Sequence, residues 1–212
     1  MRKCLCPPII PLKSFLFCQS YKYYLQLLRG KLYDQFFTEM KTDGGMVPFY
    51  DPDVYGRSLF EMSSFLASGV FTDPDVQGRG FQARLSGSTS EYLTVWKLMF
   101  MGPHPFLLSD EGELEMSLVP ALPFWLFEDE ESGFEPVRDA EGHSTVSWKL
   151  FASIMVTYHN TLGTDLFDVE PTKYVVHMEE GEDVEVDGPR VPMATAVLIR
   201  KILGVKSIDV YF

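Results

Sequence analysis

The spacing of the apolar residues changes at one point in the chain, and this change limits the folds that are available. Before Gly102 and Pro103, apolar side chains recur every three or four residues, which is typical of amphipathic helices. Beyond this pair they alternate with polar side chains, as in strands that have one buried face. Helices and strands therefore do not alternate along the chain, which argues against a doubly wound fold. The pattern predicts an α+β protein whose helical part ends near Gly102.

The helical part is expected to contain three helices. The first covers residues 20–41, although Gly30 weakens it by roughly 1 kcal/mol relative to alanine. The second begins at a capping box at 58–61 and runs to about Ser68, and the third begins at a capping box at 88–91. The expected buried face of the first helix consists of Tyr21, Leu25, Leu28, Leu32 and Phe36.

The second part is expected to form strands that are antiparallel, each with one face buried. A polar stretch at 128–143 lacks periodicity and is interpreted as a long loop. The segments with strand character are 114–118, 146–158 (interrupted by apolar Phe151 and Met155), 173–178, 183–186 and 207–212.

Charge and cysteine positions narrow the class of protein. The formal net charge is −12, with +5 on residues 1–42 and −17 on the remainder. An acidic body repels a phosphate backbone, so nucleic acid is not an expected partner. The cysteines at 4, 6 and 18 all precede the expected globular body, so no disulfide framework is expected there. No apolar run approaches the roughly 18–20 residues of a membrane span, and we expect a cytoplasmic protein with no membrane partner.

The segment from Arg84 to Glu91 is the best candidate for a ligand contact. Ser86 and Gly87 lie at an expected helix start, where up to four backbone N–H groups lack partners and the helix dipole is positive. Arg84 adds a fixed positive charge. The segment is therefore either a phosphate cradle or an ordinary well-capped helix.

Other candidate residues carry weaker signals. The loop at 51–57 contains Asp51, Asp53 and Arg57, which form either a turn with a local ion pair or contacts to sugar hydroxyls. The histidines lack the spacing of metal ligands, and each is interpreted as a surface or packed side chain. They stand at positions 104, 143, 159 and 177, and no residue is assigned to a metal.

The order of several motifs resembles a known family. The motifs are Asp51-Pro-Asp-Val-Tyr-Gly-Arg-Ser-Leu-Phe-Glu61, Ser63-Ser-Phe65, Arg84-Leu-Ser-Gly-Ser-Thr89, Gly102-Pro-His-Pro-Phe106, Leu118-Val-Pro-Ala-Leu-Pro123 and Val156-Thr-Tyr-His-Asn160. Their order over residues 45–212 resembles the C-terminal region of inverting glycoside phosphorylases of the cellobiose and chitobiose phosphorylase type. The branch that includes β-1,3-oligoglucan phosphorylases is the most similar.

The resemblance implies a fold. It predicts that the last helices of an (α/α)6 barrel are followed by an antiparallel β-sandwich of the jelly-roll type. The chain then divides into a poorly specified leader at 1–18, a partial barrel segment at 19–102 and a β-sandwich domain at 103–212.

The resemblance also implies chemistry. Inorganic phosphate is the co-substrate, with no further cofactor, and it attacks where water attacks in an inverting hydrolase. Ser86 and Gly87 match a Thr-Gly pair that holds phosphate in the family. Further substrate or anion contacts are expected from Arg84, Arg57, Asp53 and Glu61.

The family's general-acid Asp has no match in this chain, and neither does its upstream phosphate-binding His. We therefore expect a fragment that is inactive alone, and whether the chain is itself an enzyme stays open. The expected ligands are a β-glucan-type oligosaccharide and phosphate. Self-association is expected through exposed helix faces such as that of Leu25, Leu28 and Leu32. The alternative is a non-catalytic carbohydrate-binding or assembly module, which aromatic residues such as Trp125 and Trp148 favour.

Overall fold

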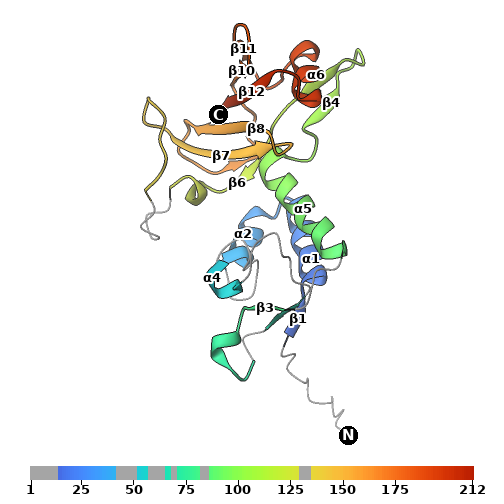
Figure 1. Ribbon diagram of the computed structural model, residues 1–212, viewed down its shortest axis with the longest axis vertical. Coiled ribbons are helices and arrows are strands. Elements are labelled where there is room, and N and C mark those ends of the chain that lie inside the picture. The colour runs from blue at the N-terminus through green and yellow to red at the C-terminus, as the bar shows by residue number, and fades with distance from the viewer. Residues whose placement is uncertain (1–13, 42–51, 57–64, 68–70, 82–85, 129–134) are drawn as a thin grey trace, which may run out of the picture. The chain divides into compact units, whose positions relative to one another are not determined.

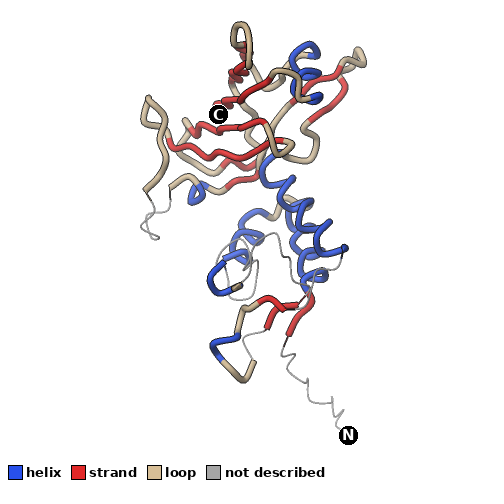
Figure 2. Tube along the Cα trace, viewed as in Figure 1, coloured by secondary structure: helices blue, strands red, loops and turns tan. Residues whose placement is uncertain are grey.

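A computed structural model describes residues 14–41, 52–56, 65–67, 71–81, 86–128 and 135–212. The chain divides into two compact units, residues 1–95 and 96–212, and the boundary falls inside one helix. Helices dominate the described part of the first unit, and strands dominate the second (Figure 2). The α+β class predicted from the sequence is confirmed.

The segment expected to form one helix at 20–41 forms two, α1 (Phe17–Arg29) and α2 (Tyr33–Lys41). The chain breaks where Lys31 takes a left-handed conformation with φ 58°, next to the predicted weak point at Gly30. The amide of Leu32 donates to the carbonyl of Leu27, and the carbonyl of Leu32 accepts from the amide of Phe36, so this residue ends one helix and starts the next. Its side chain is 52% exposed, which makes the prediction that it is buried wrong. The other four expected positions are buried: Tyr21, Leu25, Leu28 and Phe36.

A small antiparallel sheet in the first unit corrects a second prediction. Residues Phe65–Ala67 form strand β2, which pairs with β1 (Ser14–Leu16) on one side and β3 (Gly80–Phe81) on the other. The helix expected to run to Ser68 is therefore wrong at these positions. The strands that pair with β2 are distant from it in sequence, so the local helical spacing could not reveal this pairing. The capping box at 58–61 lies outside the described residues.

Helix α5 (Ser86–Met101) confirms the third predicted helix and its end. It begins two residues before the expected capping position, so Ser88 lies within its first turn. The helix stops at Gly102, whose φ of 78° is the left-handed conformation that glycine adopts at helix C-termini. The described part of the first unit also contains the short helix α4 (Pro52–Tyr55) and the 3-10 turn η1 (Pro74–Val76).

The second unit is built on a five-stranded sheet (Figure 1). The strand order is β11-β10-β12-β8-β7, and all neighbours are antiparallel except β12 and β8, which are parallel. The expectation of a purely antiparallel arrangement is thus corrected for one pair. The strands are β7 (Ser144–Leu150), β8 (Ile154–Asn160), β10 (Lys173–Met178), β11 (Val184–Asp187) and β12 (Val205–Tyr211).

Two features of this unit were not predicted. The segment 146–158 is a hairpin whose chain reverses at Phe151 and Ala152, both of which have positive φ. The apolar residue at 151 that interrupts the alternation of apolar and polar side chains therefore marks a turn. Helix α6 (Met193–Lys201) follows β11, where no element was expected. Strands β11 and β12 run in the same direction because both are antiparallel to β10, and α6 lies in the connection that such a pair requires.

The core of the second unit lies on one face of the sheet. Inward positions alternate with outward ones, so Tyr158 on β8 and Val210 on β12 are completely buried. Two small sheets complete the unit, β4 (Phe106–Leu108) with β5 (Leu114–Met116) and β6 (Ala121–Leu122) with β9 (Leu166–Phe167), together with the 3-10 turn η2 (Phe124–Leu126).

Candidate functional site

The face of the five-stranded sheet that points away from the core carries histidine and aspartate side chains. His159 lies on β8, Asp209 on β12 and His177 on β10, all three on the outward positions of their strands. The strand register places Asp209 opposite Thr157 on one side and opposite Val175 on the other. His159 and His177 each lie two residues along from those partners, on opposite sides of Asp209. The parallel pairing of β8 and β12 thus sets Asp209 between two imidazole rings.

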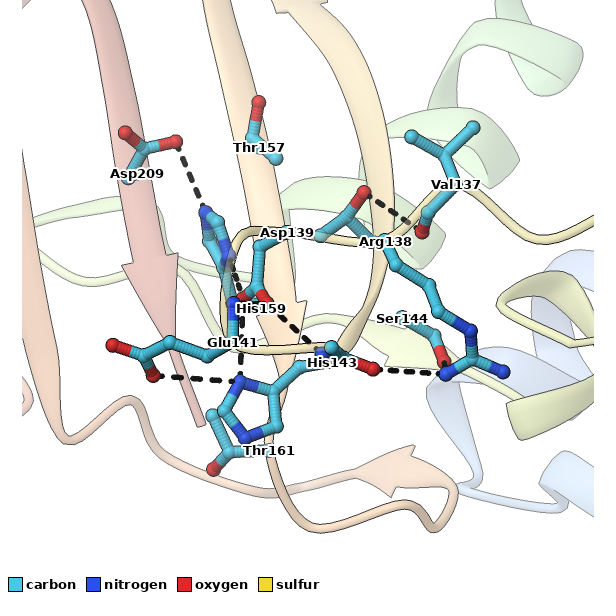
Figure 3. A network of polar contacts seen from close by, with 12 residues as sticks. Val137, Arg138, Asp139, Glu141, His143, Ser144, Thr157, His159, Thr161 and Asp209 are labelled. Atoms are coloured by element: carbon cyan, nitrogen blue, oxygen red, sulfur yellow. Dashed lines mark hydrogen bonds and ion pairs between the residues drawn. The ribbon is translucent and has the colours of Figure 1, made fainter.

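Six side chains form a continuous line, which we call the His–Asp chain. Asp139 Oδ2 lies 3.2 Å from His143 Nδ1 and 2.8 Å from His159 Nδ1. Asp209 Oδ1 lies 3.1 Å from His159 Nε2, and its Oδ2 lies 2.8 Å from His177 Nε2. Asp183 Oδ2 ends the line, 2.7 Å from His177 Nδ1. Figure 3 shows the section from His143 through Asp139 and His159 to Asp209.

Local sequence explains how Asp139 reaches this face. The residues Asp139-Ala-Glu-Gly-His143 form a turn in which the amide of Asp139 donates to the carbonyl of His143. Asp139 Oδ1 accepts hydrogen bonds from the amides of Glu141 at 3.0 Å and His143 at 2.9 Å. An aspartate that bonds to amides further along its own chain is typical of such turns. Its second oxygen is left for the imidazole of His159.

The environment of each ring determines its charge. Only 9% of the His159 side chain is exposed, and burial by itself lowers the pKa of this imidazole. The hydrogen bonds to Asp209 and Asp139 outweigh burial, so the pKa of His159 lies above its ordinary value. The bond to Asp209 raises the pKa of His177 in the same way. The His–Asp chain therefore favours imidazolium rings between carboxylates.

The carboxylates respond in the opposite direction. Burial by itself raises the pKa of Asp139, but hydrogen bonds from His159 and from the His143 backbone reverse this, so its pKa lies well below its ordinary value. The hydrogen bond from His159 is the main cause of the lowered pKa of Asp209. Both carboxylates are therefore ionised across the range in which the rings titrate.

Two contacts extend this face beyond the His–Asp chain. The ring of Tyr211 stacks on His159 with centroids 4.3 Å apart and planes 16° apart. The hydroxyls of Ser147 and Thr157 lie 3.0 Å apart on the adjoining strands. The face therefore offers hydroxyl, carboxylate, imidazole and aromatic groups side by side, a mixture suited to polar ligands.

The arrangement is a line rather than a convergent cluster. Within the described ranges, no three His, Cys, Asp or Glu side chains are grouped so that they could hold a metal ion. The described helices also include none that is long and apolar enough to cross a membrane.

None of the residues predicted from the sequence belongs to the His–Asp chain. Ser86 and Gly87 are the first two residues of α5, although the side chain of Ser86 lies outside the description. Asp53 is an exposed residue of α4. The remaining predicted contacts, Arg57, Glu61 and Arg84, lie outside the described residues.

Sequence reasoning missed the His–Asp chain, because the four histidines were each interpreted in isolation. Three of them belong to it, and the fourth, His104, is exposed. One signal was present in the sequence: His159, His177 and Asp209 all occupy polar positions of alternating segments. Their proximity depends on the strand order, which the spacing does not contain.

Two expectations about apolar residues are also corrected. Trp148 faces the core and is 7% exposed, so it is not available to stack on a ligand. Leu25 and Leu28 are 6% and 5% exposed, so two of the three residues expected to form an exposed helix face are buried, whereas Leu32 is exposed. Trp125, by contrast, is partly exposed.

Comparisons with known proteins give no family. No family model matches the chain, and no curated protein matches it significantly.

We expect the free energy of unfolding to fall as the pH rises above about 6.5. A histidine with a raised folded-state pKa contributes stability that is complete below its unfolded pKa and is lost as pH rises through the folded pKa. The pKa of Asp209 is lowered, so the stability that its carboxylate contributes is lost only at lower pH, as the carboxylate becomes protonated. Hydrogen bonds to charged groups contribute about 1.5–3 kcal/mol, so a loss of this order is expected between pH 6 and pH 9.

Urea denaturation at the two pH values measures this loss. The variant His159→Gln serves as the control because it has no titrating ring at position 159, and its stability should fall less between the same pH values. An equal or larger fall in the variant would contradict the assignment.

Proposed function

We propose that the chain is the C-terminal part of a glycoside phosphorylase-like carbohydrate-active enzyme, acting on β-glucan-type oligosaccharides and not catalytic by itself. The proposal rests first on the ordered motifs over residues 45–212. The structural observation that carries it is the change at Gly102 from a long helix to a strand-rich unit. The family resemblance predicts a change of this kind at this point in the chain.

In the proposed arrangement, α5 is a late helix of an (α/α)6 barrel. The strand-rich unit corresponds to the C-terminal β-sandwich of the jelly-roll type. The β12–β8 parallel pair and α6 are departures that this arrangement must accommodate. The proposal therefore places the sugar and phosphate on the helical side of Gly102.

Phosphate binding is assigned to Ser86 and Gly87. The first turn of α5 offers backbone N–H groups and the positive end of a 16-residue helix, which stabilise an anion. The hydroxyl of Ser86 takes the role that a threonine hydroxyl has in the family. Arg84, Arg57, Asp53 and Glu61 are proposed further contacts to phosphate or sugar.

No residue of this chain is assigned the role of general acid. Inverting phosphorolysis needs a carboxylic acid that protonates the leaving glycosidic oxygen while phosphate attacks. Without that acid, the chain should bind phosphate and oligosaccharide but should not cleave the oligosaccharide.

Two measurements on the full chain test the proposal. Calorimetric titration with β-1,3-gluco-oligosaccharides in the presence of phosphate should detect binding, and Gly87→Val should weaken it by crowding the helix start. Incubation of the same mixture should release no glucose 1-phosphate above the level in buffer. Robust release of glucose 1-phosphate would contradict the claim that this chain lacks the general acid. The absence of binding heat at millimolar oligosaccharide would contradict the proposed carbohydrate role.

A non-catalytic carbohydrate-binding or assembly module is the second candidate. The observation in its favour is the polar outer face of the five-stranded sheet, where Tyr211, Thr157 and Asp209 lie together. The variant Thr157→Val distinguishes the candidates, since it should reduce sugar binding only if this face is the site.

A further inference from the structure

Asp209 connects the two halves of the His–Asp chain. Each of its carboxylate oxygens faces a different imidazole, that of His159 or that of His177. Each ring uses its other nitrogen to face a second carboxylate, at Asp139 or Asp183. The two rings thus make four contacts, all with carboxylate oxygens.

This geometry specifies the protonation of the rings. A neutral imidazole has one N–H donor and one bare nitrogen, whereas an imidazolium has two donors. A bare nitrogen about 3 Å from a carboxylate oxygen is repulsive because both atoms carry lone pairs. All four contacts are therefore hydrogen bonds only when His159 and His177 are both imidazolium.

The outer carboxylates belong to segments outside the three strands of the line. Asp139 lies in the segment 137–143, which precedes β7. Asp183 lies in the turn 179–183 between β10 and β11, where its Oδ1 accepts the amide of Met178 at 3.2 Å. Each segment is thus linked to the sheet through one imidazole, in addition to backbone bonds at its ends, such as that from the amide of Glu179 to the carbonyl of Gly204 at 2.8 Å.

We propose that His159, His177 and Asp209 form a pH-operated clasp, in which the two imidazolium rings hold the segment 137–143 and the turn 179–183 against the sheet and release them when they lose their protons. Deprotonation of each ring converts one hydrogen bond into a repulsive contact. The clasp does not rest on the phosphorylase-like function, although Asp209 also belongs to the outer sheet face of the second candidate function.

Backbone bonds limit how much of the first segment moves. The carbonyl of Val137 accepts the amide of Thr145 at 2.8 Å, and this bond does not titrate. Release therefore affects the turn from Asp139 to His143, with Val137 as its fixed end. In the turn, the His143 amide reports on the clasp because it donates to Asp139 Oδ1.

The charges around the rings favour protonation of the rings. Both pKa directions, raised for the rings and lowered for Asp209, agree with the geometry. Lys206 and the ion pair of Lys173 with Glu185 add charges of both signs nearby. The titratable groups that face the clasp are Glu141, His143 and Asp139 from the segment, Asp183 from the turn, and Tyr211 from β12.

Nuclear magnetic resonance of the full chain, with ¹⁵N-labelled histidine, tests the clasp. The chain has only four histidines, so each ring can be assigned by single His→Gln variants. At pH 7.5 an unperturbed imidazole is about one-tenth protonated, whereas a larger fraction of His159 and of His177 should be imidazolium. The amide signals of His143 and Met178 should shift with the same midpoints as the rings as the pH is raised.

Three substitutions assign the contacts. Asp209→Asn should lower the pKa of both rings, because each ring loses a charged partner. Of the two rings of the clasp, Asp139→Asn should lower the pKa of His159 only, and Asp183→Asn that of His177 only. Asp187→Asn is the matched control, since it removes an exposed carboxylate from β11 without touching either ring.

The titration of the unaltered chain keeps the test informative if Asp209→Asn fails to fold. Rings that are no more protonated at pH 7.5 than an unperturbed imidazole would overturn the proposal. So would amide signals of His143 and Met178 that stay unchanged while the rings titrate, because the segments would then remain attached.

Discussion

Replacing Gly102 with alanine is expected to destabilise the second unit by roughly 2–5 kcal/mol. Two costs combine at this position. The backbone has φ 78°, a conformation that costs a residue with a Cβ about 1–2 kcal/mol. A Cβ here would also lie 2.3 Å from the carbonyl oxygen of Val119, so the backbone of one segment must move.

Gly112→Ala provides a matched control. Gly112 has nearly the same φ, 80°, but an added Cβ would meet no atom within 4 Å. Its alanine variant should therefore show the conformational cost alone, about 1–2 kcal/mol. Urea denaturation of the two variants separates the contact with Val119 from the backbone strain, and equal losses would show that the Val119 segment moves away at little cost.

The sequence predicted those parts of the fold that local patterns determine. The end of α5 follows from a glycine and a proline next to each other, and strand β10 follows from alternation across 173–178. Gly30 lies close to the point where the segment 20–41 divides into two helices. The sequence pattern predicted only that this glycine would destabilise a single helix, not that it would end one. Helix propensity differences of about 1 kcal/mol cannot decide such a case, because packing outweighs them.

Non-local pairing was beyond such reasoning. Strand β2 is a strand because β1 and β3 pair with it, although its own spacing is also compatible with a helix. The candidate site depends on non-local pairing even more. Asp209 and His159 are 50 residues apart, and only the parallel register of β12 with β8 brings them within hydrogen-bonding distance. The predicted residues at Ser86 and Gly87 are contiguous, which is why a sequence pattern could single them out.

Truncating Tyr158 to alanine is expected to cost roughly 3–5 kcal/mol, as for other buried aromatic side chains. The ring is completely buried on the inner face of β8. It packs edge-on against Phe212, with centroids 5.3 Å apart, and at a tilt against Trp148, with centroids 6.0 Å apart. Removing it leaves a cavity beside the rings of Phe212 and Trp148.

The hydroxyl of Tyr158 adds a separate, smaller contribution. It donates a hydrogen bond to the carbonyl of Phe100, in the last turn of α5. Carbonyls in the last turn of a helix have no partner within the helix, so this hydroxyl satisfies a group that would otherwise be buried and unpaired. Tyr158→Phe removes the bond but keeps the ring, and it should cost about 1–3 kcal/mol.

Thermal and urea denaturation of Tyr158→Ala, Tyr158→Phe and the surface variant Leu162→Ala measure these contributions. Leu162 is 53% exposed, and its truncation should change stability by no more than about 0.5 kcal/mol. Tyr158→Ala is expected to destabilise the protein most, Tyr158→Phe less, and Leu162→Ala least. A Tyr158→Phe variant as stable as the unaltered chain would mean that the Phe100 carbonyl finds another donor, and a Tyr158→Ala variant close to the Leu162→Ala control would contradict the packing of the sheet core around this ring.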